Sequence, residues 1–228
     1  MGLLKDAKAI ASRDPAARSV LSVILLYPGF HILIYHKVSH FLYRIKLRGL
    51  ARWNSQLARR VTGIEIHPGA QIGSGLFIDH GMGIVIGETA VIGDNCTIYH
   101  NVTLGGRGHQ KGHKRHPTLG NNVLVGAGAK ILGNVTIGDN ASIGANAVIL
   151  YDVPAGATVV GVPGKIVKID GVPANHAEEL DHAVNPDPLE QELCMLKHRI
   201  IALEKALNDK NVADADISSG KDGNSEGD

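Results

Sequence analysis

Aliphatic residues recur every six positions through the middle of the chain, and small or apolar residues precede most of them by two positions. The recurring positions are Ile66, Ile72, Ile78, then Ile86, Ile92, Ile98, Leu104, then Leu119, Val125, Ile131, Ile137, Ile143 and Ile149. Six residues rotate an α-helix by about 600°, so successive members would leave any one helix face. The spacing instead predicts short strands joined by tight turns, three strands to each turn of a triangular parallel β-helix.

Turn-forming residues follow the same rhythm. Gly93-Asp94-Asn95 and Gly138-Asp139-Asn140 supply the backbone conformations that a tight corner requires. Of the 28 glycines, 22 lie in residues 63–171. Chance spacing in a glycine-rich chain is the alternative, and thirteen matching positions argue against it. We therefore predict a mainly β fold with the β-helix domain at residues 63–171.

The six-residue register breaks twice. Eight residues separate Ile78 from Ile86, so two extra residues are inserted around residues 79–83. Fifteen residues separate Leu104 from Leu119, which predicts a protruding loop at residues 105–117. Regular solenoids hold such insertions rigidly and often carry function on them. Candidate site residues are therefore sought at these two places.

Residues 1–62 have a helical pattern. Asp14 before Pro15 predicts a helix start, with Asp14 as the N-cap. Pro28-Gly29 interrupts the pattern, and a second helix is expected from Phe30 to Leu47, ended by Gly49. Its apolar positions are Ile34, Val38, Phe41, Leu42 and Ile45.

The C-terminal quarter of the chain has a different character. Residues 172–187 carry Pro173 and Pro186, are followed by Pro188, and are predicted to be a linker. A heptad pattern then predicts a helix over residues 188–210, which either forms a coiled coil between copies or packs on its own domain. We favour the coiled coil, because little else is present for such a helix to bury against. Residues 211–228 are polar and acidic, and disorder is expected there.

Charge is segregated along the chain although the net charge is only +1. Residues 1–62 carry +9, residues 63–171 carry 0, and residues 172–228 carry −8. A solvated basic face is expected near the N-terminus rather than a nucleic-acid interface, since no recognised binding motif accompanies the charge. The apolar runs are too short to span a bilayer, no signal peptide opens the chain, and two cysteines make no disulfide framework. A cytoplasmic location is therefore expected.

Histidine is abundant, with 12 residues, and four of them, His80, His109, His113 and His116, lie in the register breaks. His80 follows Asp79 in the first break, and His116 lies in the second. A histidine beside a carboxylate in a forced bulge is suited to general base catalysis, because its side chain titrates nearest neutrality.

Several segments resemble the serine O-acetyltransferases, a family of hexapeptide-repeat acyltransferases. The Asp-His bulge at residues 78–83, the Gly-Glu-Thr-Ala stretch at 87–90 and Arg-His-Pro at 115–117 are the most specific. The Arg-Asp-Pro-Ala at 13–16 and Gly-Phe-His at 29–31 match as well, and the resemblance covers roughly residues 12–170. It implies a left-handed β-helix behind an N-terminal helical region.

The resemblance also implies an activity and an assembly. The family transfers acetyl from acetyl-CoA to the hydroxyl of L-serine, which commits serine to cysteine biosynthesis, and its sites lie between neighbouring β-helices of a trimer. We expect a homotrimer here, with a dimer of trimers as the alternative. Inhibition by cysteine is a family trait. The long members bind O-acetylserine sulfhydrylase through a C-terminal Ile, whereas this chain ends at Asp228, which argues against that complex.

Carried onto this sequence, the family's catalytic base is His80, and its carboxylate partner is Glu65, where the family usually has Asp. The family's substrate-binding residues match Asp14 and Asp79 for the serine ammonium and hydroxyl end, and Arg115 and His116 for the carboxylate. The positions matching its CoA groove and oxyanion site are Gly105, Gly106, Ala127, Lys130 and Ala145. Lys111 and Lys114 are candidate phosphate contacts by charge alone. No metal is expected.

Three other interpretations stay open from the residues. His109, His113 and His116 could bind zinc, as in the zinc-dependent carbonic anhydrases that share hexapeptide β-helices. An acetyltransferase with another hydroxyl acceptor is the nearer alternative. A non-catalytic scaffold that only displays loops is a third interpretation, and an absence of thioester cleavage would favour it.

Overall fold

The computed structural model describes residues 2–108, 112–174, 199–200 and 203–204. The helices and strands named below all belong to one compact unit, Met1–Asn175. The predicted C-terminal helix and tail lie outside the described residues, except that residues 199–200 and 203–204 have helical backbone.

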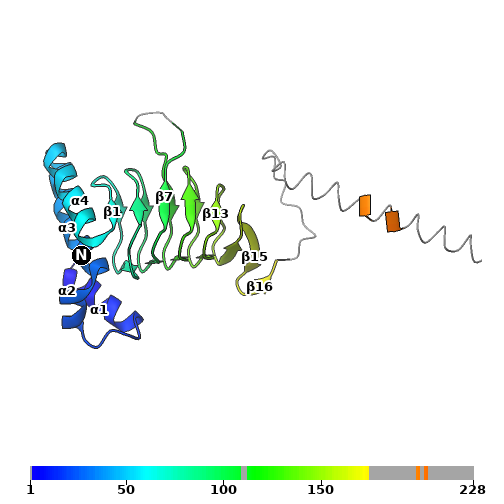
Figure 1. Cartoon of the computed structure of the whole chain (residues 1–228), viewed down its shortest axis with the longest axis horizontal. Coiled ribbons are helices and arrows are strands. Elements are labelled where there is room, and N and C mark those ends of the chain that lie inside the picture. The colour runs from blue at the N-terminus through cyan, green and yellow to red at the C-terminus, as the bar shows by residue number, and fades with distance from the viewer. Residues whose placement is uncertain (1, 109–111, 175–198, 201–202, 205–228) are drawn as a thin grey trace, which may run out of the picture. The chain divides into compact units, whose positions relative to one another are not determined.

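Short parallel strands wind into a β-helix with three flat sides (Figure 1). Side A consists of β1 (Glu65–Ile66), β4 (Val85–Ile86), β7 (Thr103–Gly105), β10 (Lys130–Leu132) and β13 (Val148–Ile149). Side B consists of β2 (Gln71–Ile72), β5 (Val91–Ile92), β8 (Thr118–Leu119) and β11 (Thr136–Ile137). Side C begins with β3 (Phe77–Ile78), β6 (Thr97–Ile98), β9 (Leu124–Val125) and β12 (Ser142–Ile143). The chain visits the sides in the order A, B, C, so the predicted three-strand coil is confirmed.

The register stacks the six-residue repeat into one core. On side A, Ile66 pairs with Ile86, Ile86 with Leu104, Leu104 with Ile131, and Ile131 with Ile149. These five side chains are at most 2% exposed. The small residues two places earlier, such as Ala90 and Ala129, are fully buried as well. Of the thirteen repeat positions, Ile72 is the exception, being only partly buried.

The corners between sides are closed by residues with positive φ. Asn95, Asn101, Asn122, Asn140 and Asn146 have φ between 56° and 61°, in the left-handed region that asparagine tolerates better than most residues. The Asn and Gly punctuation seen in the sequence therefore supplies the turns.

The far end of the coil departs from the prediction. β14 (Ala157–Val160) still pairs parallel with β12, but β15 (Lys165–Ile169) and β16 (Val172–Pro173) run antiparallel. The chain reverses at residues 161–164, where Gly161 has φ 97°. Residues 172–173, which were expected to begin the linker, therefore pair with β15.

Four helices lie at the other end of the coil: α1 (Leu3–Arg13), α2 (Val20–Leu26), α3 (Pro28–Arg44) and α4 (Arg48–Thr62). The predicted N-cap role of Asp14 is wrong, since Asp14 follows the last residue of α1 with extended backbone. Ser19 caps α2 instead, and Gly49 lies in the first turn of α4 rather than ending α3.

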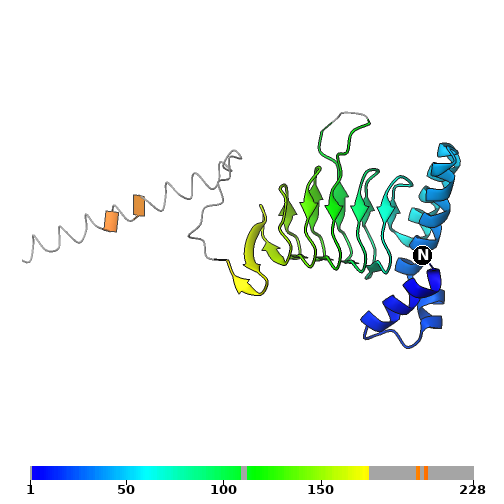
Figure 2. The same cartoon turned by 180° about the vertical axis from the view of Figure 1, so that it is seen from behind.

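The face of α3 that packs inward also differs from the expected apolar stripe. Phe30, Ile32 and Leu33 are buried, whereas Val38 and Phe41 are 48% and 62% exposed. Figure 2 shows the helices gathered at this end of the coil. No single described helix is long and apolar enough to cross a bilayer, although α2 and α3, bent by 68° at their junction, pass that test as a pair.

Polar contacts fix α1 on the first coils. Arg13 donates from Nη1 to the carbonyl of Asn95 at 2.9 Å and from Nη2 to the carbonyl of Gly75. Its guanidinium also lies over the ring of Phe77, 5.7 Å from the centroid. Asp6 accepts from the main-chain N–H of Gly75 at 2.9 Å. The C-terminal end of α1, and with it Asp14, is thereby held against the coil.

His36 on α3 makes the fold sensitive to acid. It is buried, and its Nδ1 lacks a hydrogen-bond partner among the described residues. Burial lowers its pKa to about 4, with His40 and His67 adding to the effect. The unfolded chain binds a proton near the ordinary pKa of about 6.5, so this stability is present above that pH and is lost as pH falls toward 4.

We therefore expect the free energy of unfolding to fall by roughly 3 kcal/mol between pH 7 and pH 4 from this group alone. The variant His36→Leu removes the titrating group, so its urea unfolding should vary less with pH by that amount. Equal pH dependence in both proteins would contradict the assignment.

Candidate active site

The first register break places Asp79 and His80 at the corner between sides C and A, here called the C–A corner (residues 79–83). His80 has φ 58°, which is uncommon for a residue with a Cβ and is often found at functional sites. Its side chain is 73% exposed, with Nε2 3.9 Å from Oδ1 of Asp79. The ring also meets His100 of the next coil edge to face, with 5.7 Å between centroids. An accessible imidazole beside a carboxylate is therefore held in a strained bulge.

Asp14 and Tyr27 form a second polar group near this corner. The hydroxyl of Tyr27 donates to Oδ2 of Asp14 at 2.6 Å, and the N–H of Ala16 donates to Oδ1 at 2.8 Å. The hydrogen bond to Asp14 raises the pKa of Tyr27 to about 12, and the charge of Asp79 contributes to the rise. Both carboxylates therefore act on the same phenol.

Gly29 explains how this group reaches the bulge. A Cβ at Gly29 would lie 2.3 Å from the carbonyl oxygen of Ile78, so only glycine lets the start of α3 pack there. Tyr27 lies two residues before Gly29, and Asp79 follows Ile78. Tyr27 was not found from the sequence, because a lone tyrosine before a proline carries no recognisable signal.

The second register break places Arg115 and His116 at the corner between sides A and B. This A–B corner contains residues 87–90 of one coil and residues 115–117 of the next. His116 is 6% exposed, and its Nδ1 lies 2.9 Å from Oγ1 of Thr89. A Cβ at Gly87 would lie 1.9 Å from Cδ2 of His116, so Gly87 leaves the space that the ring fills. Burial lowers the pKa of His116, which favours the neutral imidazole.

Arg115 extends beside this histidine with a 42% exposed side chain. Its Nη2 lies 4.0 Å from Oε2 of Glu88, and Glu88 also accepts a hydrogen bond from Tyr43 at 3.0 Å. Gly105 ends β7 at the same corner, and the α-carbon of Gly106 borders both Arg115 and His116. A cationic fork next to a neutral imidazole suits a carboxylate ligand.

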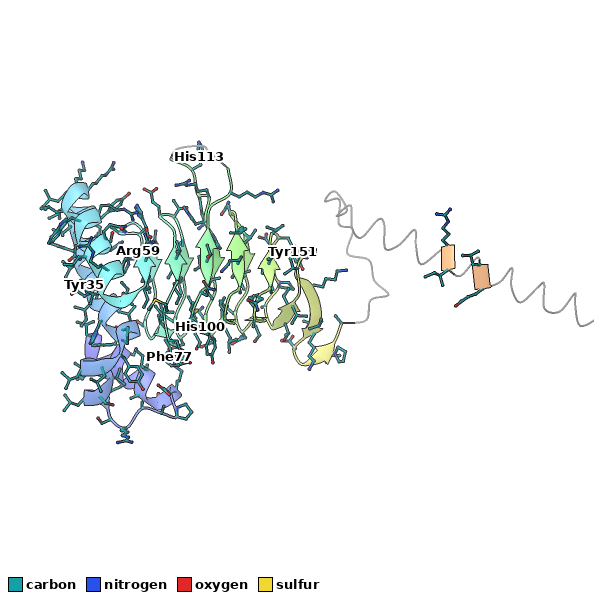
Figure 3. The ribbon with its side chains drawn as sticks, in the orientation of Figure 1. Tyr35, Arg59, Phe77, His100, His113 and Tyr151 are labelled. Carbon is teal, nitrogen blue, oxygen red and sulfur yellow. The ribbon has the colours of Figure 1, made fainter. Side chains whose placement is uncertain are left out.

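The two corners lie at opposite edges of side A. Figure 3 shows His100, the neighbour of His80, and His113, in the loop before Arg115, on opposite sides of the coil. A six-residue side spans at most about 20 Å. The structure therefore brings Asp14, Asp79 and His80 together, and separately Gly105, Gly106, Arg115 and His116, but it does not join the two sets within one chain.

Ala127 and Ala145 lie at the C–A corner in later coils than His80. Ala127 follows β9 and Ala145 follows β12, and the N–H of Asn146 donates to the carbonyl of Ala127 at 2.8 Å. Lys130 on β10 donates from Nζ to the carbonyl of Asn101, which lies at the same corner. Ala127 and Ala145 therefore lie at this corner with Lys130 beside it, whereas the other predicted groove positions, Gly105 and Gly106, lie at the A–B corner.

Glu65 has other partners than the histidine that the family pattern assigns to it. It forms ion pairs with Arg52 at 2.9 Å and Arg59 at 3.0 Å, both on α4. The N–H of Gly83 donates to the carbonyl of Gly63, and the N–H of Glu65 donates to the carbonyl of Ile84. These main-chain hydrogen bonds place β1 next to the C–A corner. Within the described residues, no hydrogen bond or ion pair joins Glu65 to His80. Its role as the base's partner stays a prediction.

The structure describes only part of the loop that carries the histidines of the alternative zinc site and the two lysines considered as phosphate contacts. His109 and Lys111 fall outside the described residues, His113 is exposed, and Nδ1 of His116 is engaged by Thr89. In the part of the chain that the structure describes, no group of three His, Cys, Asp or Glu side chains is placed to hold a metal ion. Lys114 donates to the carbonyl of Thr89 at 3.0 Å.

Comparisons with known proteins agree on one family. The bacterial transferase hexapeptide family (six repeats) matches residues 116–150. The serine acetyltransferase of Synechococcus elongatus is 54% identical over 214 residues, covering 94% of this chain and 86% of that protein.

Solved structures give the same result. The Neisseria gonorrhoeae serine acetyltransferase in complex with serine is 47% identical, with a TM-score of 0.68, covering 72% of this chain and 66% of that one. The Brucella abortus serine acetyltransferase in complex with coenzyme A is 43% identical, with a TM-score of 0.71, covering 73% and 66%. The chain thus spans slightly less than two thirds of these solved proteins.

The close fit of His116 against Gly87 predicts a measurable displacement. In Gly87→Ala the new methyl group would overlap the imidazole, so the ring must leave its cradle and become accessible. We expect diethyl pyrocarbonate to modify His116 severalfold faster in this variant, as read by mass spectrometry of the peptide.

Gly49→Ala is the matched control, since a Cβ there meets nothing within 4 Å. Unchanged protection of His116 in Gly87→Ala would contradict the described packing.

Proposed function

The chain belongs to the serine acetyltransferase family, and on this premise we propose that it transfers the acetyl group of acetyl-CoA to the hydroxyl of L-serine, giving O-acetyl-L-serine for cysteine biosynthesis. The observation that carries the proposal is the exposed His80, held beside Asp79 in a bulge of a hexapeptide coil. Acetyl-CoA is a co-substrate in this reaction.

His80 is the proposed general base. Its imidazole takes the proton of the serine hydroxyl while the oxygen attacks the thioester carbonyl, which forms a tetrahedral oxyanion. Collapse of that intermediate breaks the C–S bond, and the imidazolium returns the proton to the leaving CoA thiolate. The Asp79 carboxylate lies beside this ring, with Oδ1 3.9 Å from Nε2.

The substrate's charges fit the two corners separately. Asp14 and Asp79 offer carboxylates to the serine ammonium, and the hydrogen bonds from Tyr27 and Ala16 hold Asp14 in place. Arg115 offers a guanidinium to the serine carboxylate, and His116 offers a further polar group beside it. This division places opposite charges on either side of a zwitterion.

The distance between the corners supports a site shared by two copies of the chain. Serine is much shorter than a side of the coil, which spans at most about 20 Å and lies between the corners of His80 and Arg115 in one chain. A homotrimer with the C–A corner of each copy facing the A–B corner of the next would supply both sets. The left-handed coil of this family is part of the proposal. Dimerisation of such trimers would rest on the exposed apolar stripe of α3, which includes Val38 and Phe41.

Acetyl-CoA is proposed to lie along the same contact. Ala127 and Ala145 leave room for the pantetheine arm, and Lys130 supplies a cation for a phosphate. The main-chain N–H groups near Gly105 and Gly106 are placed to stabilise the oxyanion.

Cysteine nucleophiles have no part in this scheme. Cys96 is fully buried with a raised pKa caused by that burial, and its thiol lies 3.1 Å from the carbonyl of Gly120. A direct transfer between two bound substrates therefore fits the described residues better than an acyl-enzyme.

The first test is CoA release from acetyl-CoA with L-serine, compared with L-homoserine and sugar acceptors. Serine should be the preferred acceptor. His80→Ala should lower kcat by about 10²- to 10⁴-fold, because the general base is lost. His113→Ala, which removes an exposed loop histidine, should leave the rate within about twofold. A near-normal rate in His80→Ala would refute the base assignment.

Mixed trimers test whether two copies share each site. His80→Ala and Arg115→Ala chains are each expected to be inactive alone. When they are co-expressed in equal amounts, about a quarter of the contacts should pair an intact His80 with an intact Arg115 of the neighbour. We therefore expect about a quarter of the normal activity per site, and no recovery would show that each site lies within one chain.

A further inference from the structure

Thr89 lies directly opposite His116 across two successive coils. The pairing of β5 with β8 aligns Val91 with Thr118, so the residues two places earlier, Thr89 and His116, also face each other at the A–B corner. Nothing in the spacing of the sequence singles out Thr89 beyond its place in the Gly-Glu-Thr-Ala stretch. Its contacts in the structure assign it a role toward the histidine.

The hydroxyl of Thr89 uses its full hydrogen-bonding capacity. Its oxygen accepts from the main-chain N–H of Arg115 at 3.0 Å and from that of His116 at 3.2 Å. A threonine hydroxyl has two acceptor sites and one proton. The remaining proton therefore points to Nδ1 of His116, which lies 2.9 Å away.

The same nitrogen accepts a second hydrogen bond. The main-chain N–H of Thr89 donates to Nδ1 of His116 at 3.2 Å. A main-chain N–H can only donate, so Nδ1 must carry a lone pair rather than a proton. A neutral imidazole in this setting bears its proton on Nε2.

The Nε2 atom is left available to a ligand. None of the hydrogen bonds that the described residues form with His116 involves Nε2. The space above the α-carbon of Gly106 brings Nε2 and the Arg115 side chain together, since a Cβ there would lie 3.0 Å from Nε2 and 3.3 Å from Cγ of Arg115. A donor at Nε2 and the Arg115 side chain therefore border the same position beside Gly106.

We propose that Thr89 is a positioning residue for the serine site, which fixes His116 as the neutral Nε2–H tautomer so that it donates a hydrogen bond to the substrate carboxylate. The proposal rests on the proposed function, because it takes serine as the ligand. Burial of His116 and the neighbouring charges of Arg115 and Lys114 favour the neutral ring, whereas Glu88 opposes them. Burial and neighbouring charges do not decide which ring nitrogen bears the proton. The hydrogen bonds from Thr89 do.

Thr89→Val and Thr89→Ser separate the hydroxyl from the shape of the side chain. In Thr89→Val we expect the KM for serine to rise about tenfold, with the KM for acetyl-CoA nearly unchanged, because His116 no longer presents a fixed donor. Thr89→Ser keeps the hydroxyl and should stay within about twofold of the parent. Thr158→Val, at a half-buried threonine on β14, is the matched control and should leave both KM values unchanged.

Nitrogen spectra of the unmodified protein test the tautomer without relying on a variant that must fold. Long-range proton–nitrogen correlations of histidine-labelled protein, with His116 assigned by its loss in His116→Asn, should show an unprotonated Nδ1 and a protonated Nε2. The Thr89→Val spectrum should show that pattern weakened or mixed, and the Thr89→Ser spectrum should keep it.

The outcomes separate the proposed function from the role of Thr89. An absence of serine-dependent CoA release by the parent protein would overturn the proposed function. An active parent whose His116 carries its proton on Nδ1, or whose serine KM is unchanged in Thr89→Val, would overturn the role of Thr89 alone. A rise in both KM values together would indicate a general loss of structure and would also contradict it.

Discussion

Stacking of one aliphatic side chain upon the next, at intervals of one coil, is the interaction on which the structure depends. Ile66, Ile86 and Leu104 occupy equivalent positions in successive coils, and each is almost fully buried. Because the sides are so short, any residue added to a coil must leave the stack at a corner. The first insertion therefore lies at the C–A corner, and the described residues 115–117 of the second lie at the A–B corner.

The same constraint keeps two groups of polar side chains on different edges of the coil. One edge holds an accessible imidazole with carboxylates around it, and another holds a guanidinium and a buried neutral imidazole. A single stiff coil cannot bend to bring these edges together, because its core is continuous along the whole length. On the proposed function, assembly of copies would complete a site for a small zwitterion, and catalysis would then depend on oligomerisation.

Much of the architecture could be predicted from residue spacing, since burial in a hexapeptide coil depends on strict periodicity. Thr89 and Tyr27 could not be identified in that way, because their roles arise from contacts between residues 27 and 13 positions apart. The reversal of β15 and β16 was also missed, since it depends on one turn after Gly161. The pairing of Glu65 with two arginines likewise depends on where α4 packs.

The N-terminal helices position part of the candidate site on the coil. Asp14 lies beyond the end of α1, and the hydrogen bonds from Arg13 to main-chain carbonyls of the coil help to hold it there. Gly29 lets α3 approach Ile78 closely enough for Tyr27 to meet Asp14. The most direct test of a serine site shared between two copies is a crystal structure of the assembled protein with L-serine bound. It should show the serine hydroxyl within about 3 Å of Nε2 of His80 in one copy, with the serine carboxylate on Arg115 and His116 of the neighbouring copy. Serine held entirely by one copy, or bound away from His80, would contradict the account.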